Sequence, residues 1–290
     1  MAAGWGGNSM VWPLRRVLVM SPVAPLEESD WRAFGYLRPM NHRQALDEHA
    51  ALRDLLTGFG VEVVSGELDD SRLQDGIFPF DPSFVTDGGA VIGRMGKELR
   101  RGEEEVAEAT LIDLGIPILG RIEPPGTLEG GDCLWLDERT LAIGRGYRSN
   151  AEGIRQMAQL LATQGVEVVP VGLPHWHGPD ECLHLLSLIS MVDGDMAVVY
   201  LPLLETAFVE LLLERGVQLI AIPDSELTTQ GCNVLATAPR RCILLKENQI
   251  TAELLATAGC EVTLYTGGEI SHNRAGGPTC LTRPLLRERG

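Results

Sequence analysis

Five segments of the chain repeat apolar residues at the spacing of an amphipathic helix. They are 42–58, 97–114, 151–164, 204–215 and 248–258. Each is followed by a glycine that can adopt the left-handed conformation in which many helices end. These glycines are Gly60, Gly115, Gly165, Gly216 and Gly259. The pattern predicts five helices, each ending at a glycine cap.

A short run of β-prone residues follows each capping glycine at once. The five runs are 61–64, 116–119, 166–169, 217–220 and 260–263. Further apolar segments lie between them, at 17–20, 83–91, 133–136, 141–144, 196–201, 233–237, 242–245 and 279–282. Each repeat therefore predicts two or three strands and one helix.

Successive capping glycines lie 55, 50, 51 and 43 residues apart, which indicates a repeated supersecondary unit. Five such units could close into a ring with strands inside and helices outside, because closure leaves no unpaired edge. An ordinary α/β sandwich with evenly spaced loops fits the spacing equally well. No charged or low-complexity linker divides the chain, so we expect one domain over residues 1–290, with residues 1–14 as a flexible N-terminal extension.

The charge of the chain narrows the class of ligand. Its 24 basic and 40 acidic residues give a net charge of −16. Such a field repels a phosphate backbone, so we expect no nucleic-acid partner. It attracts small cations, although the same charge also serves solubility.

Six cysteines are scattered without paired spacing, which favours reduced thiols and a cytoplasmic protein. The first apolar residues are interrupted by Pro13, Arg15 and Arg16 before a signal-peptide core can form. No apolar run reaches the length of a membrane span, so we expect no membrane association.

Three stretches carry candidate chemistry. Cys280 follows the pair Gly276-Gly277, where backbone can approach a ligand closely, although a free cysteine is more often a small buried hydrophobe. Glu129 precedes Gly130-Gly131-Asp132. This stretch is either a plain turn or a rigid loop that positions its two acids to bind a planar cation. His184 lies in the apolar run 182–190, where a lone histidine is usually a satisfied core residue.

Charged residues elsewhere offer weaker candidates. Asp81 and Asp87 are six residues apart on a strand-like segment, so on a regular strand they would share a face. Arg100 and Arg148, taken singly, would be surface cations. His175, His177 and His184 are ligand types for zinc, but their spacing matches no standard pattern, so we predict no metal.

Taken together, these residues resemble the guanidino-group-modifying enzymes of the pentein fold, most closely the dimethylarginine dimethylaminohydrolase family. The resemblance rests on six motifs in the family's order. They are Asp-x-x-Phe-Val-x-Asp at 81–87, Arg-Arg-Gly-Glu at 100–103, Glu-Gly-Gly-Asp at 129–132, Gly-x-x-x-Arg-Ser-Asn at 144–150, Leu-His-Leu-x-Ser at 183–187 and Gly-Gly-x-Thr-Cys-Leu at 276–281.

The resemblance implies an α/β fold, a five-bladed αβ propeller of pseudo-repeated ββαβ units, which agrees with the glycine spacing. It implies no cofactor and no catalytic metal. Cys280 matches the nucleophile, His184 the general acid and base, and Glu129 the carboxylate that orients the histidine. Asp132 matches a structural position that supports the turn of Glu129.

The same resemblance implies the residues around the substrate. Asp87 matches the position that grips the guanidinium, and Asp81, Arg100 and Arg148 match positions at the amino-acid end, with the arginines facing the substrate carboxylate. Thr86 stands where methylarginine hydrolases usually carry a glutamate that helps to bind the guanidine end, which weakens the expectation of a dimethylated substrate. Arginine deiminases and amidinotransferases usually have His-x-Asp where this chain has His184, Leu185 and Leu186.

The expected function is a cysteine-dependent hydrolase that cleaves a C–N bond of a small cationic guanidino compound, methylated arginine or arginine, through a covalent amidino-thioester to give citrulline. The thiolate is the better nucleophile for the delocalised guanidinium carbon, and a bound cation would lower the thiol pKa. An amidinotransferase and an arginine deiminase are the alternatives within the fold. A catalytically silent pentein binding module is the alternative outside enzymes, and a homodimer is one expectation for the oligomeric state.

Overall fold

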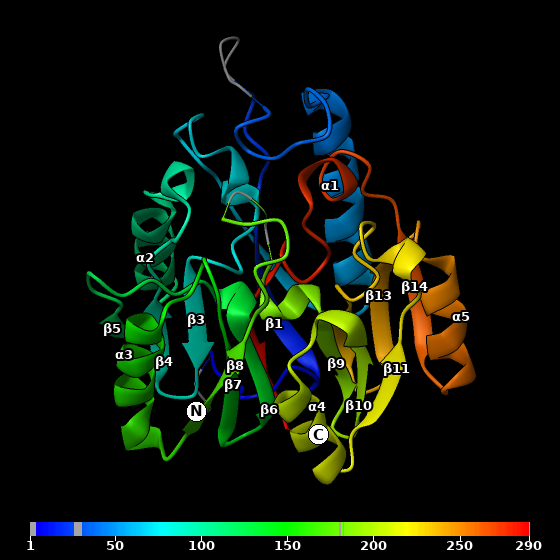
Figure 1. Ribbon diagram of the computed structural model, residues 1–290. Helices are drawn as coiled ribbons and strands as arrows, with labels where there is room; N and C mark the ends of the chain where they lie inside the picture. Colours follow the sequence, from blue (N-terminus) through cyan, green and yellow to red (C-terminus); the bar gives the residue numbers. More distant parts are fainter. Residues whose placement is uncertain (1–3, 26–30, 180, 182, 290) are drawn as a thin grey trace.

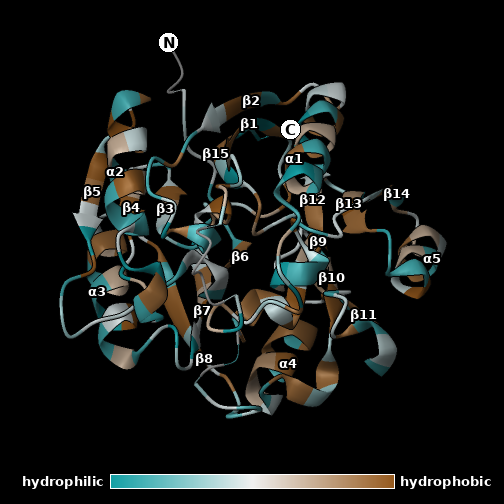
Figure 2. Ribbon diagram, turned by 90° about the horizontal axis from the view of Figure 1, so that it is seen from above, coloured by the Kyte–Doolittle hydropathy of each residue, from teal (hydrophilic) through white to brown (hydrophobic). Residues whose placement is uncertain are grey.

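The chain forms a ring of similar units, seen along its axis in Figure 2. The computed structural model describes residues 4–25, 31–179, 181 and 183–289. Over these residues there are five three-stranded sheets, each accompanied by one α-helix. Figure 1 shows the helices at the outside of the molecule, with the sheets between them.

Four of the units are continuous in sequence and repeat the order strand, strand, helix, strand. They are β3 (Ser83–Thr86), β4 (Gly89–Ile92), α2 (Glu103–Asp113) and β5 (Ile118–Arg121); β6 (Cys133–Asp137), β7 (Thr140–Arg145), α3 (Ala151–Leu161) and β8 (Glu167–Gly172); β9 (Ile189–Asp193), β10 (Met196–Val199), α4 (Thr206–Glu214) and β11 (Gln218–Ala221); and β12 (Leu235–Ala238), β13 (Arg241–Leu245), α5 (Gln249–Thr257) and β14 (Glu261–Tyr265).

The fifth unit joins the two ends of the chain. β15 (Arg283–Arg287) pairs antiparallel with β1 (Leu14–Met20), and β1 pairs parallel with β2 (Glu62–Gly66) after α1 (His42–Gly58). In every sheet the first strand is antiparallel to the middle strand, and the middle strand is parallel to the third. Parallel neighbours require a crossover, which the helix provides on the outside of the ring.

The strands nearest the ring axis are β3, β6, β9, β12 and β15 (Figure 2). Every residue of the axial strand β3 and of the middle strands β4 and β10 is buried. This burial on both faces explains why their sequences are almost continuously apolar. The helices pack on the outside through single apolar faces, such as Leu52 and Leu56 of α1, which are 1% and 0% exposed. Burial of each such leucine side chain contributes about 1.5–3 kcal/mol to the free energy of folding.

The glycine-capped helices expected from the sequence are confirmed. Gly60, Gly115, Gly165, Gly216 and Gly259 all adopt left-handed backbone, with φ between 68° and 87°. The predicted ring of five ββαβ units is confirmed as well.

Several element boundaries differ from the prediction. The segment 83–91 is a hairpin, not one strand, because it turns at Asp87 and Gly88. Helix α2 begins at Glu103, because Gly102 precedes it with φ +106°. Residues 279–282 form turns, and the strand follows them as β15. β9 was missed, because it continues the apolar run around His184 without a polar break.

Over its described residues, the N-terminal segment packs against the inner edge of β15. Residues 1–3 lie outside the described part. The Gly6 N–H donates to the Leu285 carbonyl at 2.8 Å, and Gly6 accepts from the Arg287 N–H at 2.8 Å. Asn8 and Val11 are 5% and 8% exposed. The segment therefore covers backbone groups at the inner edge of β15.

None of the helices in the described part of the chain is both long and apolar enough to cross a bilayer.

Candidate active site

Four of the candidate site residues lie at equivalent places in the ring. Each precedes an axial strand by two to five positions: Asp81 before β3, Glu129 before β6, His184 before β9 and Cys280 before β15. Because the units repeat around one axis, the starts of these strands meet at one end of the ring. Residues far apart in sequence therefore converge there.

Glu129 and His184 are in direct contact. His184 Nε2 is 2.7 Å from Glu129 Oε2, and both side chains are buried. Arg148 Nη1 donates to both oxygens of Glu129, at 3.0 and 2.8 Å, and the Gly96 N–H donates to Oε1 at 2.8 Å. These bonds fix the carboxylate, which in turn orients the imidazole.

Asp81 is fixed by hydrogen bonds from Arg100 and from the Gly131 backbone. Arg100 Nη1 donates to Asp81 Oδ2 at 2.6 Å, and the Gly131 N–H donates to Oδ1 at 2.9 Å. Arg100 also binds both oxygens of Glu103, from Nε at 2.9 Å and Nη2 at 2.7 Å. A charge-assisted network of this kind gives Asp81 one orientation.

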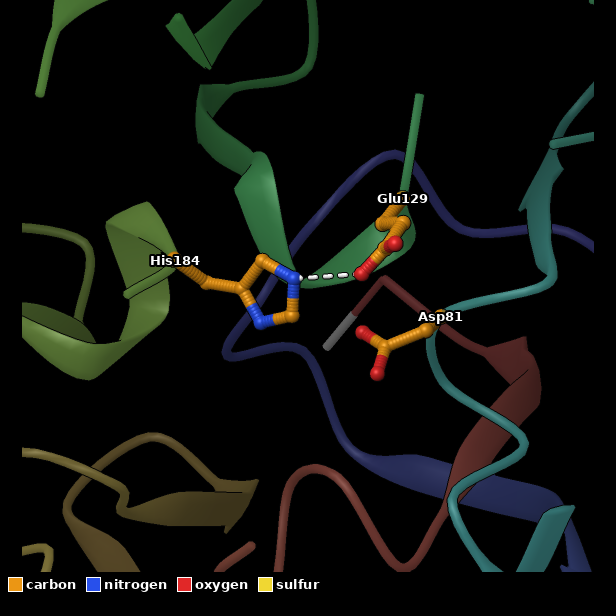
Figure 3. Close-up of side chains that lie close together, drawn as sticks. All are labelled: Asp81, Glu129 and His184. Carbon is orange, nitrogen blue, oxygen red and sulfur yellow. Dashed lines mark hydrogen bonds and ion pairs between the residues drawn. The ribbon is translucent and has the colours of Figure 1, made fainter. Parts of the chain in front are cut away.

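Asp81, Glu129 and His184 form one cluster, which Figure 3 shows with all three side chains pointing toward a common space. One ligand atom from each lies within 4.8 Å of the others. The spacing would suit a metal ion. It also suits a planar cation, and the cluster already binds that type of group through the guanidinium groups of Arg100 and Arg148.

The glycine pair of the Glu-Gly-Gly-Asp motif is required by this close packing. A Cβ on Gly130 would lie 2.0 Å from the Phe80 carbonyl oxygen. A Cβ on Gly131 would lie 2.5 Å from His184 Nδ1 and 2.7 Å from Asp81 Oδ1. The motif therefore permits contact between backbone and site side chains, and is more than a turn.

Cys280 is half-buried and in contact with Asn233, which precedes β12. Asn233 Nδ2 donates to Cys280 Sγ at 3.1 Å, while Asn233 Oδ1 accepts from the Thr279 N–H at 3.0 Å. A Cβ on Gly277 would lie 2.4 Å from the Asn233 amide carbon. The second glycine pair thus lets the cysteine loop approach Asn233.

The electrostatics of the cluster favour an ionised Glu129. Burial opposes ionisation, yet the Arg148 guanidinium and the contact with His184 hold the pKa of Glu129 well below its usual value. Burial instead raises the pKa of Asp132 to about 6, against the His184 charge and hydrogen bonds from Ser149 and Leu185. Asp132 Oδ1 accepts from the Leu185 N–H at 2.9 Å, which fits a structural part in fixing the residue next to His184.

Asp87 and Thr86 do not lie with the other candidates. Both are at the turn end of β3, whereas Asp81 precedes its start. Six residues of extended chain span roughly 20 Å, so Asp81 and Asp87 cannot line the same small pocket. Asp87 is exposed and accepts from the Gly7 N–H at 2.7 Å. Thr86 is fully buried, and its hydroxyl donates to the Gly89 carbonyl at 2.9 Å.

The two predicted carboxylate-binding arginines contact protein acids. All three guanidinium nitrogens of Arg100 donate to Asp81 or Glu103, so the structure makes it a positioning residue for Asp81. Arg148 binds Glu129 in a similar way. The resemblance implies that both face a substrate carboxylate, and that role stays a prediction.

The alternative zinc site is not assembled. In the described residues, the cluster of possible metal ligands contains His184 with Asp81 and Glu129, but neither His175 nor His177. His175 Nδ1 instead lies 2.6 Å from the Tyr147 hydroxyl, and His177 packs on Trp176. Cys182, part of the same sequence stretch, lies outside the described residues.

Sequence reasoning missed Asn233 and Glu103. Asn233 was assigned to a strand, although it occupies in its unit the pre-strand position that Asp81 and Cys280 occupy in theirs. Glu103 belongs to the Arg-Arg-Gly-Glu motif, but its pairing with Arg100 depends on the helix start at residue 103. The internal repeat was the signal that could have identified Asn233.

Comparison with known proteins agrees with this geometry. A model of the arginine deiminase family matches residues 72–210 and 201–287. An arginine deiminase from Listeria welshimeri is 28% identical over 73% of this chain, and the chain spans 61% of that relative's length. The dimethylarginine dimethylaminohydrolase of Streptomyces coelicolor is 30% identical, over 84% of this chain and 86% of the relative. Both names denote hydrolases of C–N bonds in amidines.

Solved structures give the same fold. A cysteine-to-serine variant of the Pseudomonas aeruginosa dimethylarginine dimethylaminohydrolase, in complex with citrulline, superposes with a TM-score of 0.77 at 26% identity, covering 96% of this chain and 100% of that one. The N-terminal domain of ArgZ, a cyanobacterial arginine dihydrolase, gives a TM-score of 0.80 at 20% identity, covering 94% and 97%. The chain therefore belongs to the arginine deiminase family and has the five-bladed pentein fold of its guanidino-modifying members.

Proposed function

We propose that the protein hydrolyses a C–N bond of a small guanidino compound, with Cys280 as the nucleophile. The observation that carries the proposal is the convergence of Asp81, Glu129 and His184 on one space at the end of the ring where Cys280 also lies. Two carboxylates suit a planar cation, and a half-buried thiol beside an amide donor suits attack on its carbon.

The chemistry follows from these positions. The Cys280 thiolate adds to the guanidinium carbon while Asp81 and Glu129 hold the nitrogens. His184, oriented by Glu129, protonates the departing amine or ammonia as the C–N bond breaks. The amidino-thioester is planar and cationic, so the same acids stabilise it. His184, now neutral, takes a proton from water, which attacks the carbon and releases a ureido product and the thiolate.

Asp81 takes the guanidinium-binding part that the resemblance gave to Asp87, because it is Asp81 that lies beside the histidine. Methylated arginine and arginine are the proposed substrates, in keeping with the names of the relatives. Thr86 no longer bears on this choice, since it lies at the other end of β3. Leu186 is buried and apolar, so its position supplies no acid to the site.

A substrate panel tests the proposal. Arginine, monomethylarginine, dimethylarginine and simple guanidines would be incubated with the protein and assayed for ureido product, with and without an added amine acceptor. We expect ureido product from at least one amino-acid substrate, independent of the acceptor, and none from the Cys280→Ser variant. A new guanidine formed only with the acceptor would instead indicate amidino transfer. Equal activity in the Cys280→Ser variant would refute the proposed nucleophile.

The structure describes five of the six cysteines. Four of them are buried, and only Cys280 is half-exposed. A nucleophilic thiol needs reducing surroundings, so we propose a cytoplasmic location.

A further inference from the structure

Two arginines that take no part in the proposed reaction lie buried inside the ring. Arg283 and Arg287 are 3% and 4% exposed, and both belong to the axial strand β15. They are four residues apart, so their side chains leave the same face of the strand. Their positive charges therefore lie in one part of the interior.

Neither arginine has a carboxylate partner among the residues that the structure describes. Arg287 donates to the carbonyls of Trp12 and Ala236, at 2.6 and 2.8 Å. Arg283 donates to the Phe80 carbonyl, and its guanidinium lies 3.9 Å from the centre of the Phe80 ring. Arg283 Nε is buried and has no hydrogen-bond partner within the described ranges.

The charges of this pair are not balanced locally. Asp81 and the Cys133 thiol are the acidic groups that act on Arg283, but Asp81 is bonded to Arg100 and the thiol is buried. Burial lowers the pKa of Arg283 to about 10, and burial together with the Arg283 charge lowers that of Arg287 to about 9. Both groups are therefore still cationic at neutral pH. Two unpaired cations in an interior are costly unless an anion accompanies them.

A cavity lies where such an anion would be needed. It is lined by both arginines and by residues of every other axial strand, among them Phe84, Trp135, Met191 and Leu235. The cavity is therefore on the ring axis. Ser9 and Thr279 add polar groups to its wall, and Gly6 and Gly7 of the N-terminal segment also line it.

The size of the cavity limits the ligand. Its volume of about 30 Å³ is enough for about two water molecules. A single halide ion of the size of chloride fits this space, whereas sulfate or phosphate is larger. Aromatic walls and guanidinium donors suit a weakly hydrated monovalent anion.

We propose that this axial cavity binds one halide-class anion between Arg283 and Arg287. The anion neutralises part of the buried charge and ties β15 to the N-terminal segment, because Arg287 also binds the Trp12 carbonyl. The proposal does not depend on the reaction at Cys280, and its test measures no activity.

The experiment titrates sodium bromide into the full-length protein at constant ionic strength, with gluconate as the replacement anion, and follows the unfolding temperature. Binding to the folded state alone predicts a saturable rise, about 5 °C at a hundredfold excess over Kd. Arg287→Met should abolish the saturable rise. The control Arg15→Met removes an exposed arginine from the neighbouring strand β1 and should leave it unchanged.

A crystal of the wild-type protein soaked in bromide gives the direct readout, and it remains informative if Arg287→Met does not fold. We expect an anomalous peak in the axial cavity, within reach of both guanidinium groups. A cavity holding water only, or a temperature rise that is not saturable and is the same in bromide and gluconate, would overturn the proposal.

Discussion

Asn233 holds the cysteine loop at two atoms, and this pairing suggests a part in setting the reactivity of the thiol. Its amide nitrogen donates to Cys280 Sγ, and its amide oxygen accepts from the Thr279 N–H. A donor aimed at sulfur favours the thiolate over the thiol, because a hydrogen bond to a charged group is stronger than one to a neutral group. Asn233 is thus a positioning residue that also stabilises the nucleophilic form.

The variant Asn233→Asp tests this assignment, because it keeps an oxygen for the Thr279 N–H while it removes the donor and adds a negative charge. We expect the pKa of the Cys280 thiol to rise by about 1–2 units, since hydrogen bonds to charged groups contribute about 1.5–3 kcal/mol. The rate of iodoacetamide alkylation as a function of pH reports this value. An unchanged profile, with the unfolding temperature also unchanged, would mean that Asn233 serves only to fold the loop.

Arg148 is expected to act through Glu129 and not on the substrate carboxylate. Replacing it by leucine leaves a buried carboxylate without its main partner, so Arg148→Leu should lower kcat/KM by a similar factor for arginine and for its decarboxylated counterpart. Steady-state kinetics with the two compounds checks the ratio. A loss confined to the carboxylate-bearing substrate would instead support direct recognition of the carboxylate.

At the scale of the elements, the sequence predicts well wherever one local signal determines the structure. The five helices are predictable because a glycine with left-handed backbone follows the end of each one. The predicted strand limits differ from the structure where the turn signal was overlooked or where the sequence has none. The turn dipeptide Asp87-Gly88 stands within the segment predicted as one strand, and it places Asp87 at the end of β3 opposite to Asp81. No polar break separates β9 from the run before it.

Helix α1 carries a buried titratable group with a predictable effect on stability. Burial, with a smaller effect of the Arg53 charge, lowers the pKa of His49 to about 4, whereas an unfolded histidine titrates near 6.5. The unfolded state therefore binds more protons between these values, so stability falls as the pH drops below about 6.5.

Replacing His49 by leucine should remove this contribution to the pH dependence. We expect the free energy of unfolding of the wild type to fall, relative to that of His49→Leu, by about 1 kcal/mol between pH 7.5 and pH 5.5. Urea unfolding of both proteins at several pH values measures the difference. A difference that is constant with pH would show that His49 titrates alike in the folded and unfolded states.

At the scale of the whole molecule, the site exists only because the ring closes. Asp81, Glu129, His184 and Cys280 come from four different units and meet because each precedes its axial strand. Periodicity predicts the units but not which ends of the strands meet, so it cannot place Asp87 and Thr86 relative to these four residues. The burial of Arg100 against Asp81 and Glu103 likewise depends on packing between units.

The matched variants Asp81→Asn and Asp87→Asn test which end of the ring carries the chemistry. Loss of the Asp81 charge should lower kcat/KM at least about 100-fold, because the guanidinium loses one of its two carboxylates, whereas Asp87→Asn should stay close to wild type. Both measurements use the most active substrate of the panel. The reverse order of effects would restore Asp87 as the guanidinium ligand and remove the basis for placing the substrate beside His184.

The most direct test of the account is the mass of the Cys280 adduct. In His184→Ala, attack on the guanidine carbon can proceed slowly, but the water that completes hydrolysis lacks its base. We predict that intact-mass analysis after incubation with substrate finds one amidino adduct, that peptide mapping places it on Cys280, and that His184→Ala combined with Cys280→Ser has none. An adduct on another residue, or turnover that persists without Cys280, would contradict the central claim.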